Sequence, residues 1–344
     1  MNFSFLPISL IFLSFFLSFL LLYPFKKIAR KINLVSIPHK GSIRQDKVPT
    51  SAGIIFGPLT LVLSFAFYFF SGSQVDAFFL ALSVGTLILL FINLVDDIIG
   101  LSDYLRLFFQ FLFIFLLWIF FDIFNVIHNN SDFIFLVFIS LGLIILINSF
   151  NFMDGADGLI ASNSFLLSIT LCIIFLLENQ FPLAIIMFIF FGANLGFLFH
   201  NWAPAKIFMG DSGAIFQGSF FSVFIFHSIY FTDITTYCFA ILFLAFLVET
   251  FVVKSYIFFK FTKIFNVSHK YHSYQQEIIS TEKHRRPAMI SSIINLFWII
   301  PLTFLCYFEP QYGFLITFFA CLPLIFISYY FGPARAERMK ENEI

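Results

Sequence analysis

Charged residues are scarce in this 344-residue sequence, and their scarcity excludes a soluble protein. They make up 11% of the chain, against about 25% in ordinary soluble domains. Hydrophobic residues make up 60%, and the 59 phenylalanines outnumber the 19 acidic and 19 basic residues together. At roughly 20 residues for each membrane-crossing helix, this composition predicts an integral membrane protein with about ten spans.

The sequence also lacks segments of alternating polarity, and this excludes a transmembrane β-barrel. The strands of such a barrel alternate apolar and polar residues over about ten positions, whereas the apolar runs here are continuous over about the length of a spanning helix. A helix satisfies its own backbone hydrogen bonds in lipid. We therefore expect an all-α polytopic membrane fold.

Cysteine is rare, and its placement indicates neither a disulfide framework nor a zinc site. All four cysteines fall inside apolar runs at wide spacings: Cys172, Cys238, Cys306 and Cys321. The first apolar run, Phe3 to Tyr23, has no basic residue before it and no small-residue cleavage site after it. We therefore expect a retained first helix rather than a secretory signal.

Internal repeats and low-complexity linkers are absent from the sequence, and the loops are too short to hold a separate soluble domain. We expect one domain over residues 1–344. Any chemistry must then be done by short loops and helix ends.

Eleven apolar runs predict eleven spans, near residues 3 to 24, 52 to 71, 75 to 95, 105 to 125, 133 to 150, 159 to 178, 181 to 199, 214 to 231, 234 to 256, 288 to 307 and 312 to 331. When the loops are assigned to alternate sides, all 19 Lys and Arg lie on one face or at the helix ends that adjoin it. By the positive-inside rule this face is cytoplasmic. We expect the amino terminus outside and the carboxyl terminus in the cytoplasm.

Two acidic clusters fall on this basic face. The first, Val95–Ser102, contains the adjacent Asp96 and Asp97, which repel each other unless a cation or a basic group offsets them. The second, Asn148–Leu159, places oxygen-bearing side chains at every third residue: Asn148, Asn151, Asp154 and Asp157. A continuous helix would stack these four side chains on one face, whereas the two glycines in the stretch favour an unwound segment that lines a polar cavity.

Two further polar clusters lie on the same face. Residues 201–213, NWAPAKIFMGDSG, carry Lys206 and Asp211, and the Asp-Ser-Gly string is also typical of a helix start. Residues 268–276, SHKYHSYQQ, carry His269 and His272 among several basic residues. No Cys or third well-spaced ligand accompanies the two histidines, so an anionic ligand such as a phosphate is favoured over zinc.

Together the face offers carboxylate and amide oxygens opposite a set of Lys, Arg and His. Oxygen ligands favour magnesium or manganese over zinc or copper. Because magnesium commonly binds one or two carboxylates together with substrate phosphates, the arrangement indicates phosphoryl transfer. The surrounding apolar spans make a lipid phosphate a suitable substrate.

These motifs, in this order and with VPTSAG at Val48–Gly53, resemble the polyprenyl-phosphate N-acetylhexosamine-1-phosphate transferases, of the glycosyltransferase family 4 type. That family includes the phospho-N-acetylmuramoyl-pentapeptide transferases, and the resemblance covers nearly the whole chain. It implies transfer of an N-acetylhexosamine 1-phosphate from a UDP-sugar to undecaprenyl phosphate, with release of UMP, at the cytoplasmic face of a bacterial inner membrane. The product would start a lipid-linked surface polysaccharide. The resemblance also implies a homodimer, and no nucleic-acid partner.

The resemblance also assigns roles by motif position. Asn151 and Asp211 match the magnesium ligands, with manganese as the alternative ion. Asp157 matches the position near the uracil ring, and Asp154 completes this part of the expected catalytic set.

The remaining expected catalytic residues match positions around the phosphates. Asp96 and Asp97 match the acidic pair beside the lipid phosphate, Arg106 matches a basic residue that contacts phosphate, and His269 and His272 match the histidines that hold the pyrophosphate. A phosphate monoester has a second pKa near 6 and is mostly dianionic at neutral pH. We therefore expect positioning and charge neutralisation to contribute more than a general base.

Two strings point to different branches of the family. FLVET, residues 246–250, resembles the muramoyl-pentapeptide branch, in which Glu249 has an acidic counterpart. SHKYHSYQQ lacks the run of three histidines of that branch and resembles the branch that starts surface polysaccharides. We therefore expect a UDP-N-acetylhexosamine donor, with the pentapeptide nucleotide as the alternative.

Two other classes of protein are considered. A cation-coupled transporter would place carboxylates near mid-span, whereas the acids here gather at helix ends, with Glu249 as the main exception. A membrane scaffold without chemistry predicts that replacement of Asp211 is silent.

Overall fold

The computed structural model describes residues 6–36, 47–72, 74–260 and 269–341. Its elements follow in the order α1 (Leu6–Lys31), β1 (Val35–Ser36), β2 (Val48–Pro49), α2 (Gly53–Ser71), α3 (Ala77–Leu80), η1 (Ala81–Gly85), α4 (Thr86–Ile99), α5 (Asp103–Phe120), α6 (Ile123–Val126), α7 (Asn130–Met153), α8 (Leu159–Leu177), α9 (Phe181–Asn201), α10 (Gly210–Phe231), α11 (Thr236–Leu242), α12 (Leu244–Lys260), η2 (His269–Tyr271), α13 (Ser273–Thr281), α14 (Arg286–Ile294), η3 (Asn295–Ile299), α15 (Ile300–Phe308), η4 (Pro310–Tyr312), α16 (Gly313–Phe331) and α17 (Pro333–Glu341). The two short strands pair antiparallel.

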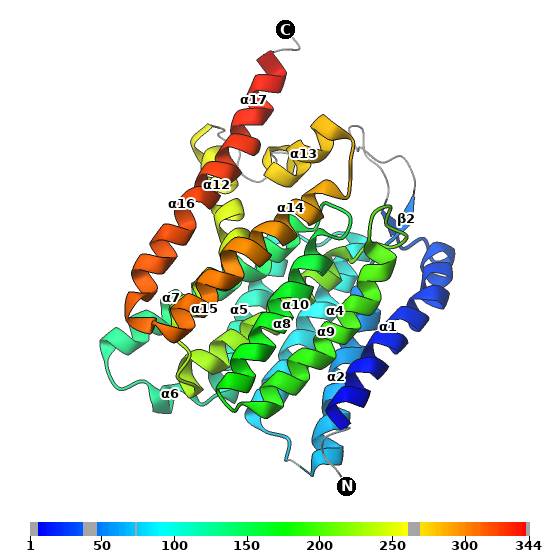
Figure 1. Ribbon diagram of the computed structural model, residues 1–344. Coiled ribbons are helices and arrows are strands. Elements are labelled where there is room, and N and C mark those ends of the chain that lie inside the picture. The colour runs from blue at the N-terminus through cyan, green and yellow to red at the C-terminus, as the bar shows by residue number, and fades with distance from the viewer. Residues whose placement is uncertain (1–5, 37–46, 73, 261–268, 342–344) are drawn as a thin grey trace.

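The all-α polytopic fold is confirmed. Among the described residues, ten helices are long and apolar enough to cross a membrane, and the bent pair α11 and α12 makes an eleventh span. The start of α1 and the end of α17 lie at opposite ends of the helical bundle (Figure 1). We call the end that carries β2, α13 and α17 the site end, and the opposite end, which carries α6, the far end.

The ninth span is broken. The axes of α11 and α12 differ by 68°, and Phe243 lies between the two helices. The sequence predicted one continuous run from 234 to 256, because neither proline nor glycine occurs there to mark a break. The ring of Phe243 packs 5.2 Å from the ring of Phe221 in α10, measured between centroids. Packing against α10 therefore holds the break in place.

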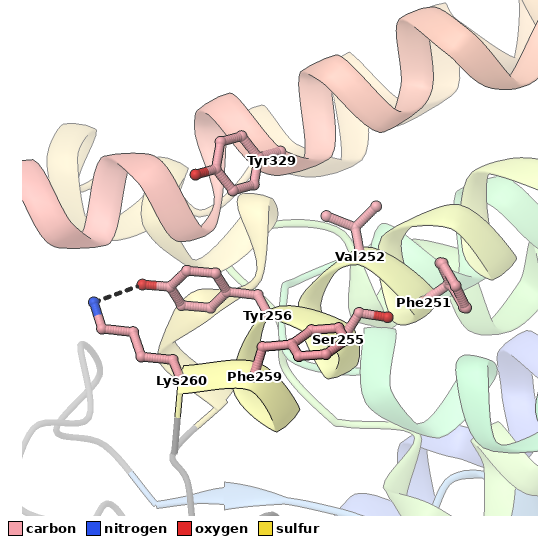
Figure 2. A pocket seen from close by; sticks show the side chains of 7 residues that line it. All are labelled: Phe251, Val252, Ser255, Tyr256, Phe259, Lys260 and Tyr329. Atoms are coloured by element: carbon pink, nitrogen blue, oxygen red, sulfur yellow. Dashed lines mark hydrogen bonds between the residues drawn. The ribbon is translucent and has the colours of Figure 1, made fainter.

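A shallow apolar groove follows α12 on the side that faces α16. Its lining residues are Phe251, Val252, Ser255, Tyr256, Phe259, Lys260 and Tyr329. Figure 2 shows Lys260 at one end of this groove, where its ammonium group donates to the hydroxyl of Tyr256 at 2.8 Å. None of the predicted site residues lines the groove.

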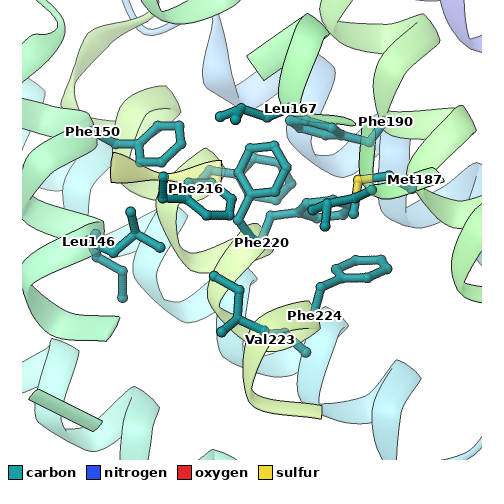
Figure 3. Close-up of a cluster of buried hydrophobic side chains, with 14 of the residues drawn as sticks. Leu146, Phe150, Leu167, Met187, Phe190, Phe216, Phe220, Val223 and Phe224 are labelled. Carbon is teal, nitrogen blue, oxygen red and sulfur yellow. The ribbon is translucent and has the colours of Figure 1, made fainter. Parts of the chain in front are cut away.

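The core of the bundle is built from phenylalanine on α10 and its neighbours (Figure 3). Phe216, Phe220 and Phe224 of α10 are fully buried. The ring of Phe220 stacks on Phe190 of α9 with centroids 4.3 Å apart, a favourable arrangement for aromatic pairs. Buried Phe150 of α7 stacks on Phe246 of α12 at 4.6 Å. These contacts fix α10, whose first turn carries the candidate site.

Candidate active site

The site is built around the start of α10. The backbone before this helix pairs with the loop before α2, since Phe208 N–H donates to the carbonyl of Pro49 at 2.8 Å and Ala52 N–H donates to the carbonyl of Phe208 at 3.1 Å. The two helices then meet at Gly53 and Gly213, where a Cβ atom on Gly53 would lie 2.3 Å from Cα of Gly213. Only glycine permits this approach. The VPTSAG and MGDSG strings are therefore adjacent in space.

Asp97 holds the first turn of α10 from the last turn of α4. Its Oδ1 accepts from the backbone N–H of Asp211 at 2.9 Å, and its Oδ2 accepts from the hydroxyls of Ser212 at 2.8 Å and Ser51 at 2.6 Å. A carboxylate at a helix N-terminus satisfies unpaired N–H groups and favours the helix dipole. The helix-start interpretation of the Asp-Ser-Gly string is thus confirmed.

Asp96 turns to a different partner. Its Oδ2 lies 3.0 Å from the guanidinium of Arg106, near the start of α5. The same guanidinium nitrogen lies 3.2 Å from Oδ2 of Asp211, and the other nitrogen donates to Asp103. Arg106 thus supplies the basic group that the acidic pair required. It joins α4, α5 and α10 at one point.

Asp211 is partly open to solvent, unlike the other acid that contacts the same nitrogen of Arg106. Its side chain is 39% exposed, against 8% for Asp96. The amide of Asn151, in the last turn of α7, donates to Oδ2 of Asp211 at 3.4 Å. These two side chains therefore offer carboxylate and amide oxygens at an accessible point.

The second acidic cluster combines helix and unwound backbone. The helix α7 continues through Asn151 and ends at Met153, and residues 154–158 form a turn. Asn148 leaves the site, because its amide exchanges hydrogen bonds with Gln110 of α5 at 2.6 and 3.2 Å. Because the helix also ends before Asp154, the four side chains do not form one stack on a helix face, and the unwound alternative holds for residues 154–158.

Asp154 lies in the turn after α7, among like charges. Desolvation by the surrounding protein, together with the carboxylates of Asp211 and Asp97, raises the pKa of Asp154 to about 8. A group of acids that suppress each other's ionisation is a place where a cation or a basic ligand is favoured.

Asp157 anchors the loop before α10. Its buried Oδ2 accepts from the backbone N–H of Ala205 at 2.9 Å. Beside it, Oδ1 of Asn201 accepts from the N–H of Gly158 at 3.0 Å, and Gly158 has a left-handed backbone with φ of 73°. The structure therefore shows a positioning contact for Asp157.

His272 is held by a buried carboxylate. Oε1 of Glu249, on α12, lies 3.4 Å from Nδ1 of His272 and accepts from the backbone N–H of Ser273 at 2.7 Å. Both side chains are buried. His269 begins η2, and its side chain lies outside what the structure describes.

Tyr274 joins the histidine segment to the turn after α7. Its hydroxyl donates to the carbonyl of Phe152 at 2.9 Å, and burial raises the pKa of Tyr274 above its usual value, so the hydroxyl stays protonated. A Cβ atom on Gly155 would lie 2.4 Å from this hydroxyl. The ring of Tyr274 stacks on the ring of His272, with centroids 5.4 Å apart. Nearby, the ammonium of Lys254 lies 3.9 Å from the centroid of the Phe152 ring. Residues 269–276 therefore contact the end of the cluster at Asn148–Leu159.

Sequence reasoning missed five contacting residues: Ser51, Asp103, Ser212, Glu249 and Tyr274. Four of them lie inside strings that the sequence analysis identified, and only Asp103 lies outside them. Glu249 had been noted in FLVET without a role. Asp103 offered no signal beyond its position three residues before Arg106.

The family described as glycosyl transferase family 4 matches residues 79–229. The match reaches from α3 into the last turn of α10 and includes both acidic clusters, Arg106 and Asp211. It ends before the histidine segment.

Curated relatives match parts of the chain. A phospho-N-acetylmuramoyl-pentapeptide-transferase of Prochlorococcus marinus is 32% identical over 203 residues, which cover 52% of this chain and 53% of that protein. A probable undecaprenyl-phosphate N-acetylglucosaminyl 1-phosphate transferase of Bacillus subtilis is 28% identical over 207 residues, 58% of this chain and 56% of that protein. A decaprenyl-phosphate N-acetylglucosaminephosphotransferase of Mycolicibacterium smegmatis is 42% identical over 81 residues, 21% of this chain and 20% of that protein. The chain spans about half the length of the first two relatives.

Proposed function

We propose that the chain, which matches glycosyl transferase family 4 over residues 79–229 and resembles its transferases, transfers an N-acetylhexosamine 1-phosphate from a UDP-sugar to undecaprenyl phosphate and releases UMP. The observation that carries this proposal is the position of Arg106 between Asp96 and the partly exposed Asp211, with Asn151 beside them. A guanidinium and oxygen ligands at the end of a membrane bundle suit phosphates that meet a lipid.

The carboxylate and amide oxygens at this site fit a magnesium or manganese ion that takes further ligands from substrate. Asp211 and Asn151 are the residues that would hold it. Among the described residues, no three His, Cys, Asp or Glu side chains converge on a common metal position, and magnesium commonly takes one or two carboxylates together with phosphate oxygens and water. When bound, the ion supplies charge neutralisation to the pyrophosphate.

The proposed reaction needs one bond formed and one broken. An oxygen of the lipid phosphate attacks the phosphorus that carries the sugar, and the bond from that phosphorus to the bridging oxygen of UMP breaks. The attacking monoester is mostly dianionic at neutral pH, and Asp97 is already engaged at the start of α10. Arg106 and His272 are therefore assigned to binding and neutralising phosphate rather than to proton removal.

The proposal places the site end in the cytoplasm of a bacterial cell, in the inner membrane. It is supported by the basic residues, which gather in the loops and helix ends of this side, including Arg30 and Lys31 at the end of α1. The homodimer implied by the resemblance stays a prediction.

A second candidate is the phospho-N-acetylmuramoyl-pentapeptide transferase reaction. It is favoured by the similarity to the phospho-N-acetylmuramoyl-pentapeptide-transferase of Prochlorococcus marinus and by Glu249 in the FLVET string. The pattern of residues 268–276 favours the amino-sugar donor, so the donor must be decided by assay.

The test is UMP release by the purified protein in detergent, with magnesium, undecaprenyl phosphate and a panel of UDP-amino sugars that includes the pentapeptide nucleotide. We expect release that requires the lipid, the metal and one donor, and that is lost in Asp211→Ala. His128→Ala changes an exposed residue at the far end and should leave release unchanged. Equal loss in both variants would contradict the site, and release without the lipid would contradict the acceptor.

A further inference from the structure

Two cysteines that are distant in sequence touch in the fold. The Sγ atoms of Cys238 in α11 and Cys306 in α15 lie 3.6 Å apart, and 68 positions separate the two residues. The hydroxyl of Thr235 lies 3.4 Å from the first sulfur and 3.9 Å from the second. Both thiols are buried. The wide spacings, which indicated no disulfide, concealed this pair.

The pair lies at the far end of the bundle. Cys238 is the third residue of α11, and Cys306 is two residues before the end of α15. Both helix ends adjoin far-end loops, which the proposed orientation places outside the cytoplasm. Disulfides persist in that environment and are rare inside cells.

We propose that Cys238 and Cys306 form a disulfide bond in the mature protein. This goes beyond the proposed activity and depends only on the proposed orientation. To form the bond, the two sulfur atoms must approach from 3.6 Å to about 2.05 Å. The side chains are already directed at each other from neighbouring helices.

The bond forms by thiol–disulfide exchange with a disulfide oxidant of the outer compartment. One cysteine thiolate attacks the oxidant and releases one of its sulfurs as a thiolate; the second cysteine thiolate then attacks the mixed disulfide and releases the other. The protein loses two protons and two electrons, and the oxidant becomes a dithiol. Because both thiols are buried in the folded bundle, exchange occurs before α11 and α15 complete their packing.

The bond would fasten the broken span to its neighbour. The helix α11 leads through the break at Phe243 into α12, which carries Glu249, and α15 continues the span that begins at Arg286 after α13. A cross-link at the far end therefore restrains the two spans whose other ends frame His272.

The remaining cysteines provide an internal control. Cys172 is buried in α8, where its thiol donates to the carbonyl of Ala184 at 3.5 Å. Cys321 lies in α16 and is half-buried. Neither has a cysteine partner among the described contacts.

The experiment counts thiols in protein from membranes prepared in N-ethylmaleimide and then denatured. In the Cys172→Ser/Cys321→Ser variant, which keeps the proposed pair, intact mass should show no alkylation before reduction and two alkylated thiols after it. Cys238→Ser/Cys306→Ser should show two alkylated thiols in both states. Full alkylation of the first variant before reduction would overturn the proposal.

A second measurement, made without any substrate, tests whether the disulfide bond stabilises the packing of the two spans. Reductant should lower the thermal unfolding midpoint of the Cys172→Ser/Cys321→Ser variant and leave that of Cys238→Ser/Cys306→Ser unchanged. An equal change of the midpoint in both variants would show that the bond does not stabilise this packing. Because neither readout uses a donor sugar, failure here is distinguishable from failure of the proposed activity.

Discussion

The carboxylate of Asp97 caps a helix to which it does not belong: its Oδ1 accepts from the backbone N–H of Asp211, the second residue of α10, at 2.9 Å. Its neighbour Asp96 pairs instead with Arg106 at 3.0 Å. Two adjacent acids that look like one unit in the sequence therefore have separate tasks. Asp97 shapes the end of α10, and Asp96 orients the guanidinium that faces Asp211.

Replacement of Asp97 should act first on stability. Asp97→Ala leaves a partly buried backbone N–H and the hydroxyls of Ser51 and Ser212 without their acceptor, at a cost of roughly 1–3 kcal/mol. We expect the thermal unfolding midpoint in detergent to fall. Asp103→Ala removes an acid whose side chain is 55% exposed and should change the midpoint little. Equal midpoints for Asp97→Ala and wild type would refute the capping role.

Arg106→Lys keeps the charge but should lower kcat/KM by about 10- to 100-fold. Lysine cannot present the planar fork that reaches Asp96, Asp103 and Asp211 together, and hydrogen bonds between charged groups contribute about 1.5–3 kcal/mol each. The measurement is UMP release at varied donor concentration. Unchanged kinetics would show that a point charge is sufficient at this position.

Glu249→Gln should impair turnover through His272. The uncharged amide no longer attracts the ring, so the histidine loses its fixed orientation, and we expect about tenfold lower kcat. In the Glu249→Gln/His272→Ala double variant the loss should equal that of His272→Ala alone, since contacting residues are not additive. Glu178→Gln, which removes a charge near the far end, serves as the control. Additive losses would mean that Glu249 acts independently of His272.

Gly155→Ala tests the contact between the second and fourth clusters. A Cβ atom there would lie 2.4 Å from the hydroxyl of Tyr274, so the ring must move and its bond to Phe152 must break. We expect reduced UMP release. The control is Gly142→Ala in the middle of α7, where an added Cβ atom meets no atom within 4 Å and activity should be retained. Equal activity of the two variants would show that the position of Tyr274 is unimportant.

The fold was largely predictable because the sequence satisfies a strong physical constraint. Spans without charge must be helical in lipid, and the eleven apolar runs correspond to the spans observed. The break at Phe243 was not predictable, since it depends on packing against Phe221 of a different helix. The composition of residues 234–256 alone does not indicate such a contact between helices.

The site was predictable where polar residues stand out against an apolar background. Asp96, Arg106, Asn151 and Asp211 lie together as expected. Asn148 shows the limit of spacing arguments. Side chains at every third residue drift gradually around a helix, and that of Asn148 hydrogen-bonds with Gln110 of α5 instead. Only tertiary packing decides which members of a repeat reach a site.

The most direct test of the account follows the phosphorus. A UDP-sugar labelled with ³²P at the phosphate attached to the sugar is incubated with the protein, magnesium and undecaprenyl phosphate, and the lipid and nucleotide products are separated. The account predicts label in the lipid product and unlabelled UMP. Label recovered in UDP, with the sugar alone on the lipid, would contradict sugar-phosphate transfer.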